Sequence, residues 1–101
     1  MANRLDLQTL FEELLGSHNV YFDPPESVKM NYPAIKYSLS KINTSFANNS
    51  AYMQNNRYEV IVIYNDPDSE LPGRISRLPM CVHDRSYVVD NLHHDVFTLY
   101  F

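Results

Sequence analysis

The sequence predicts one α+β domain in which two helices pack against a mainly antiparallel β-sheet. Its 101 residues suit a single domain of ordinary size. One segment near the N-terminus has the apolar period of an amphipathic helix, and several later segments alternate apolar with polar residues as strands do. We expect residues 1–101 to form one domain with the order helix, strand, strand, strand, helix, strand, strand.

The first helix is expected at 5–15. Apolar residues recur there every three or four positions, as on one face of a helix, and they are Leu7, Leu10, Phe11, Leu14 and Leu15. Gly16 follows directly and can adopt the left-handed conformation that ends many helices. This apolar stripe is expected to pack against another element.

Three strands are expected in the first two thirds of the chain. A short one at 19–22 ends at Pro24 and Pro25, which cannot donate hydrogen bonds to a neighbouring strand. A second at 32–39 alternates apolar residues with smaller or polar ones. The strongest is at 57–64, where aromatic and β-branched residues occupy every second position and so line one face of the strand.

A second helix is expected after the turn at 65–69. Its predicted features are a cap near Asp68 or Ser69, Pro72 in the first turn, and Leu71, Ile75 and Leu78 facing the core. Gly73 lowers its helical propensity by roughly 1 kcal/mol relative to alanine. The expected helix is therefore short and depends on packing.

The C-terminal part predicts a hairpin of two strands, at 82–89 and 92–101. Asp90 and Asn91 join the strands, and both residue types tolerate the positive φ of a two-residue hairpin turn. Such a turn pairs Val88 with His93.

Residues 43–56 carry no charge and lose the apolar period of their neighbours. Their asparagines and serines form local hydrogen bonds that compete with regular strands, so we interpret the segment as a long loop or a hairpin extension. Phe46, Tyr52 and Met53 lie within it, and large apolar side chains of this kind need cover. The segment is therefore expected to contact another molecule.

Histidines, a cysteine and acids near the C-terminus raise the question of a catalytic or metal site. A metal needs three or four ligands that converge on one point. The expected hairpin places His83 opposite Thr98, about 17 Å along the strands from His93. We therefore expect no metal site, a buried unreactive Cys81, no cofactor, and no catalytic residues.

Composition excludes other classes of function. Eight basic against 12 acidic residues disfavour binding to nucleic acid through phosphate neutralisation, and two glycines leave no room for a nucleotide-binding loop. No apolar run has the ~18–20 residues needed to cross a bilayer. A single cysteine is typical of a reducing compartment. These features favour an intracellular protein that acts through contacts with other proteins.

Several stretches of the chain resemble small tail-completion proteins of long-tailed bacteriophages. They are RLDLQTL at 4–10, NVYFDPPESVKM at 19–30, RYEV at 57–60, DPDS at 66–69, LPM at 78–80 and DNLHHDVFTLYF at 90–101. The expected order of elements is also similar to that of the tail terminator fold. These motifs are structural, so the resemblance supplies no catalytic residues.

The resemblance implies a structural virion protein. It implies a homo-hexameric ring that caps the tail tube, touches the tail tube protein and the head-completion protein of the neck, and lets DNA pass through its lumen. The protein would be assembled in the host cytoplasm and end in the tail or neck of the virion, with no membrane partner. Another neck protein (a head-completion or adaptor protein) or a small host-directed protein-binding module are the alternatives.

A ring requires surfaces that contact a neighbouring copy head to tail. The candidates are apolar or amide side chains outside the expected core, in the uncharged segment, after the two prolines and at the C-terminus. They are Phe46, Tyr52, Met53, Asn55, Val28, Met30, Tyr100 and Phe101.

Overall fold

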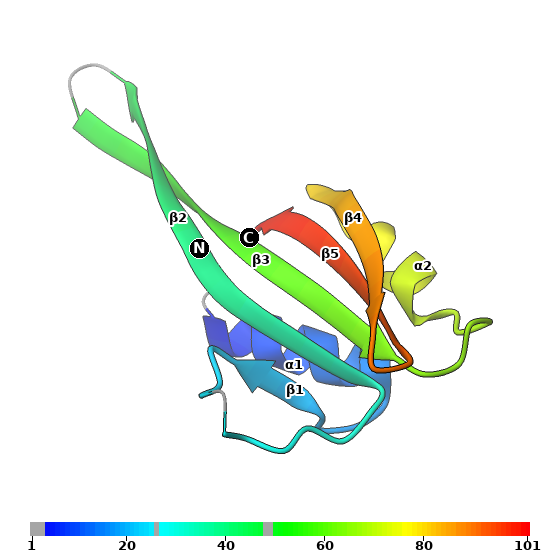
Figure 1. The fold of residues 1–101 in the computed structure, drawn as a ribbon. Helices are drawn as coiled ribbons and strands as arrows, with labels where there is room; N and C mark the ends of the chain where they lie inside the picture. The colour runs from blue at the N-terminus through cyan, green and yellow to red at the C-terminus, as the bar shows by residue number, and fades with distance from the viewer. Residues whose placement is uncertain (1–3, 26, 48–49) are drawn as a thin grey trace.

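A computed structural model describes the backbone of residues 4–25, 27–47 and 50–101, and the side chains of these ranges outside 43–55. Within these ranges the chain forms two α-helices and a mixed five-stranded sheet (Figure 1). The elements are α1 (Arg4–Leu15), β1 (Val20–Phe22), β2 (Ala34–Ala47), β3 (Ser50–Tyr64), α2 (Leu71–Ser76), β4 (Cys81–Val89) and β5 (Leu92–Tyr100). The predicted α+β class and the order of elements are confirmed.

The strand order across the sheet is β1-β2-β3-β5-β4. Three neighbouring pairs are antiparallel, and only β1 runs parallel to its neighbour β2. The contact of β1 is short, because it reaches only Ile35, Lys36 and Tyr37 of β2. The outer edge of β2 beyond Tyr37 therefore has no partner strand among the paired strands that the structure describes.

Helix α1 covers one face of the sheet because its apolar stripe is matched by aromatic side chains of the strands. Leu7 and Phe11 are fully buried, and the Phe11 ring meets the Tyr37 ring edge to face at 5.2 Å. The Tyr37 hydroxyl donates a hydrogen bond of 2.6 Å to Oε1 of Gln8, whose amide Nε2 donates to the backbone oxygen of Val20. Both the apolar and the polar groups of α1 thus fix its position on β1 and β2.

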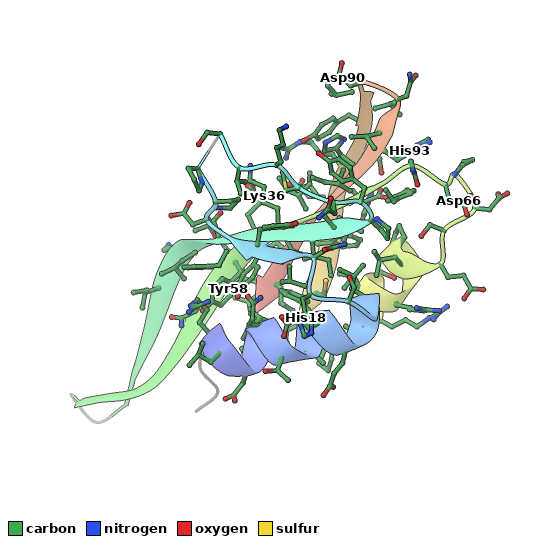
Figure 2. All side chains as sticks on the ribbon, turned by 90° about the horizontal axis from the view of Figure 1, so that it is seen from below. His18, Lys36, Tyr58, Asp66, Asp90 and His93 are labelled. Carbon is green, nitrogen blue, oxygen red and sulfur yellow. The ribbon has the colours of Figure 1, made fainter. Side chains whose placement is uncertain are left out.

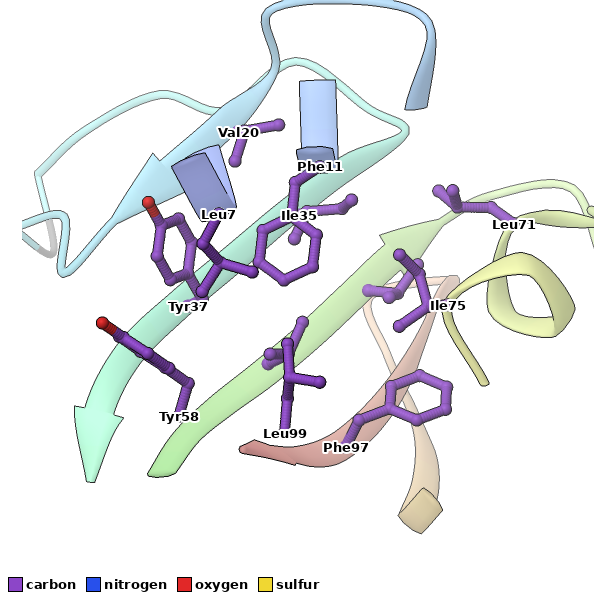
Figure 3. Close-up of a cluster of buried hydrophobic side chains, with 12 residues drawn as sticks. Leu7, Phe11, Val20, Ile35, Tyr37, Tyr58, Leu71, Ile75, Phe97 and Leu99 are labelled. Atoms are coloured by element: carbon purple, nitrogen blue, oxygen red, sulfur yellow. The ribbon is translucent and has the colours of Figure 1, made fainter. Parts of the chain in front are cut away.

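The core lies between the sheet and the helices (Figure 3). Helix α2 contributes Leu71 and Ile75 to it, as predicted. The N-cap of α2 is Glu70, without a side-chain cap, so the helix begins directly after Asp68 and Ser69, near which the sequence predicts its cap. The Ser69 hydroxyl still accepts a hydrogen bond of 3.3 Å from the backbone NH of Leu71, the first residue of α2. A side chain at the N-cap bonds the NH of the second or third helical residue instead.

Two predicted chain reversals have the expected backbone. Gly16 ends α1 with φ of +79°, and its NH donates to the backbone oxygen of Glu12. Asp90 and Asn91 both have positive φ, as a two-residue hairpin turn needs. The turn pairs Val89 with Leu92 and Val88 with His93.

The expected pairing of the hairpin holds from that turn to Arg85 and is shifted by one residue beyond it. His83 lies opposite Phe97 instead of Thr98, because a bulge lies between His83 and Arg85. A bulge inserts one extra residue into one strand and shifts every later pair by one position. The extra residue here is Asp84.

Candidate functional site

The most prominent feature of the molecule is a two-stranded extension formed by β2 and β3, which we call the arm (residues 42–47 and 50–56). Figure 1 shows the arm projecting from the body of the sheet, and the molecule measures 51 × 25 × 22 Å. The strands pair from Ile42 opposite Asn56 to Ala47 opposite Ser50, with one register shift between Ser45 and Phe46. The uncharged segment, whose sequence suggested a loop or a hairpin extension, is thus paired backbone.

Four of the predicted interface residues lie in this arm. Phe46 belongs to β2, and Tyr52, Met53 and Asn55 belong to β3. The backbone of Phe46, Met53 and Asn55 is paired, and Tyr52 lies at the register shift between Ser45 and Phe46. The side chains of all four lie outside what the structure describes. Figure 1 shows that the arm extends past the part of the sheet that α1 covers.

The C-terminal residues lie at the base of the arm. The backbone NH of Phe101 donates to the oxygen of Asn56 at 3.0 Å, and the NH of Tyr100 donates to the oxygen of Met80 at 3.1 Å. Phe101 is half-buried and packs against the core. The sequence predicts that Tyr100 and Phe101 lie outside the core, but Phe101 is partly covered by its own chain.

The remaining two predicted interface residues belong to the segment between β1 and β2. Val28 is exposed and Met30 is half-buried. A turn in which the NH of Val28 donates to the oxygen of Pro25 shapes this segment, and the Tyr21 hydroxyl accepts from the NH of Asn31. The segment lies at the β1 edge of the sheet, away from β4.

Sequence reasoning missed the outer edge of the sheet, strand β4. Every residue of β4 except Cys81 is exposed, although Val82, Tyr87, Val88 and Val89 are large and apolar. The signal was present in the sequence, because an apolar run stands directly before the Asp90 turn. The alternation of that run predicts a strand but does not indicate which of its faces is covered.

A buried carboxylate, that of Asp95, lies at the centre of a cluster of polar side chains in the sheet. Asp95 is 6% exposed. Its Oδ2 accepts from the Tyr64 hydroxyl at 2.6 Å, and its Oδ1 accepts a short bond from the Ser86 hydroxyl and lies 3.1 Å from Nε2 of His83. These groups come from β3, β4 and β5, so the cluster ties three strands together.

Burial and hydrogen bonding act in opposite directions on the pKa of Asp95 and in the same direction on the pKa of Tyr64. Burial alone would raise the pKa of Asp95, but the hydrogen bonds from Ser86, Tyr64 and His83 stabilise the carboxylate and hold its pKa below the ordinary value. Burial, together with the bond to Asp95, raises the pKa of the Tyr64 hydroxyl to about 12. Asp95 is therefore an anion and Tyr64 a neutral donor at neutral pH.

Serine, histidine and aspartate occur together in this cluster, but their arrangement differs from that of a nucleophilic relay. In a relay one ring nitrogen of the histidine faces the hydroxyl and the other faces the carboxylate. Here Nε2 of His83 faces both Ser86, at 3.1 Å, and Asp95. The Ser86 hydroxyl donates directly to the carboxylate, so its proton is not directed at the imidazole. The geometry is that of a structural network.

His93 and His94, which are consecutive in β5, point to opposite faces of the hairpin. The His93 ring stacks on Tyr64 at 5.3 Å, and the His94 ring stacks on Tyr87 at 4.7 Å. Burial raises the pKa of the Cys81 thiol. Within the described ranges, no group of three or more histidine, cysteine, aspartate or glutamate side chains is placed to hold a metal ion.

Comparisons with known proteins leave the family open. No family model matches this chain, and none of the curated proteins matches it in sequence. In the part of the chain that the structure describes, no helix has the length and apolar character needed to cross a membrane.

Proposed function

We propose that this protein is a structural subunit of a long-tailed bacteriophage, a tail terminator that forms a ring on the tail tube. The observation that carries the proposal is the arm: a long paired extension that leaves the body of a small α+β domain. Its support from sequence is the resemblance of residues 4–10, 19–30 and 90–101 to tail-completion proteins.

The physical chemistry of the arm favours self-assembly. A two-stranded ribbon with no third strand and no helix behind it is marginally stable in water. The arm beyond Asn56 is such a ribbon in the described part of the chain. Contact with a neighbouring subunit would supply the missing cover, and a contact between two different surfaces of the same chain closes into a ring when the rotation allows it.

The proposed ring contains six copies, in accordance with the tail terminator resemblance. It lies between the tail tube protein and the head-completion protein, and DNA passes through its lumen without being bound. The formal net charge of -4 is compatible with this role, because sequence-independent DNA binding relies on Lys and Arg side chains that neutralise phosphates.

Averaged electron-microscopic images of the neck of particles that contain this chain test the proposal. We expect a ring of six copies at the upper end of the tail tube. Infections in which this chain is not produced should yield heads and tails that are not joined. A ring of another symmetry, or a location outside the tail and neck, would overturn the proposal, whereas a position on the head side would assign the chain to head completion.

A further inference from the structure

The chain carries two exposed strand edges that suit one another. We propose that the β2 edge of the arm in one copy pairs with the exposed β4 edge of the next copy, residues 42–46 running antiparallel to residues 85–89. This inference rests on the proposed self-assembly and names the contact that forms it. Its steps follow from the sheet register, the charges and the exposed area.

The acceptor is the half of β4 that leads into the Asp90 turn. Exposed strand edges invite pairing with other chains unless charges, prolines or bulges block them. The first half of β4 has such protection, because the bulge at Asp84 interrupts the ladder and Asp84 pairs with Arg85 at 3.0 Å. From Ser86 to Val89 the strand has neither charge nor bulge, so this half remains open to a partner.

The donor is the outer edge of β2 beyond the reach of β1. The register of β1 ends at Tyr37, and the free part of β2 continues into the arm as far as Ala47. Ile42 is 56% exposed at the start of this stretch, and residues 42–47 carry no charge. An uncharged edge can approach the apolar half of β4 without burying an ionised group.

The charges at the ends of the two segments agree with the antiparallel direction. Lys41 is the last charged residue before the arm, and Asp90 is the first after the apolar half of β4. With the two strands antiparallel, Lys41 lies beside Asp90, Ile42 lies opposite Val89, and residue 46 reaches Arg85, where the bulge interrupts the β4 ladder. Antiparallel pairing is also the more stable arrangement per residue.

The exposed area explains why the contact needs a closed assembly. Val88 and Val89 are 60% and 48% exposed, and Tyr87 is 38% exposed. A complete aliphatic side chain offers roughly 60–120 Å² of apolar surface, so these side chains together with Ile42 supply only part of the ~800 Å² per partner in a standard interface. One such contact would be weak, whereas each copy in a ring makes it twice.

The arm of a chain does not reach its own acceptor. Ile42 pairs with Asn56, while Val88 pairs with His93, which in turn lies opposite Tyr64. Eight strand positions separate Asn56 from Tyr64, about 26 Å at ~3.3 Å per residue. Figure 2 agrees, since Asp90 lies at the opposite end of the molecule from the arm. A disulfide needs Cα atoms closer than ~7 Å, so a bond between positions 42 and 89 can form only between copies.

Cysteine cross-linking of the full chain in a Cys81→Ala background tests the proposal. One variant carries Ile42→Cys and Val89→Cys, and the matched control carries Ile42→Cys and Val82→Cys. Val82 is 61% exposed on the same strand but lies on the other side of the bulge. Circular dichroism checks that both variants fold, and mild oxidation followed by a non-reducing gel gives the result.

We expect the Ile42/Val89 variant to form covalent dimers and larger multimers at least tenfold faster than the control. Equal or slower cross-linking than the control overturns the strand pairing. Sedimentation of the wild-type chain measures self-association, and the neck images show the ring. Both test the proposed function independently of the cross-link. A six-fold ring without this cross-link therefore leaves the proposed function intact and removes only the β2–β4 contact.

Discussion

Replacing Asp95 by asparagine should destabilise the fold strongly at neutral pH. The carboxylate accepts from Tyr64 and Ser86 and lies within hydrogen-bond distance of His83. A hydrogen bond to a charged group contributes about 1.5–3 kcal/mol, against about 0.5–1.5 kcal/mol for a neutral one. Losing the charge weakens each of the three bonds by about 1 kcal/mol, so we expect Asp95→Asn to lower the free energy of unfolding by about 2–3 kcal/mol.

The stability that the Asp95 carboxylate contributes should decrease in acid. The folded pKa of Asp95 lies below its ordinary value, so the stability that the carboxylate contributes is present above the unfolded pKa of ~3.9 and is lost as the pH falls through the folded pKa. Urea unfolding at pH 7 and at the lowest pH where the chain stays folded should show a gap between wild type and Asp95→Asn that narrows in acid.

The control is Asp84→Asn. Asp84 is exposed and pairs only with its neighbour Arg85 in the described structure, so its loss should change stability by less than about 0.5 kcal/mol. A loss below about 1 kcal/mol for Asp95→Asn at pH 7, or a loss that stays the same in acid, would show that the cluster does not hold the three strands as we argue.

Three further predictions concern the core, the alkaline range and the arm. Phe11→Ala should lower the free energy of unfolding by about 3–5 kcal/mol, whereas Leu5→Ala, at a position 63% exposed, should change it by less than about 0.5 kcal/mol; thermal unfolding measures both. The folded pKa of Tyr64 is about 12, so the stability that its neutral hydroxyl contributes should be complete below pH ~10 and disappear between pH ~10 and ~12. In the Tyr64→Phe variant, the free energy of unfolding should lack this part of its decrease at alkaline pH. Replacing residues 43–55 by a short Gly-Ser turn should preserve the circular dichroism of the body but abolish ring formation, and infectious particles with normal necks would contradict the role of the arm.

Local patterns in the sequence predicted the elements whose cause is local. The spacing of Leu7 and Phe11 identified the buried face of α1, because helical period and burial coincide there. The Asp90-Asn91 pair identified the turn and the first pairs of the hairpin, because few residue types accept two successive positive φ angles. In both places the local preference and the tertiary contact favour the same structure.

Features that depend on distant partners were not predictable in this way. The bulge at Asp84 leaves no mark in the composition of β4, and it invalidated the expected partner of His83. The Asp95 cluster brings together residues from three strands, and no spacing in the sequence indicates it. The arm was ambiguous because its asparagines and serines favour turns, whereas its strands are held by cross-strand pairing.

The bulge at Asp84 also makes β4 sensitive to changes in length. One extra residue there lets Cys81 and His83 share the face of Leu99 and Phe97. Deleting Asp84 would rotate the preceding residues by one position, since neighbouring strand residues point to opposite faces. Val82 would then turn toward the core, and His83 would lose Asp95. A single-codon deletion in this exposed strand should therefore be tolerated far less well than most substitutions at the same position.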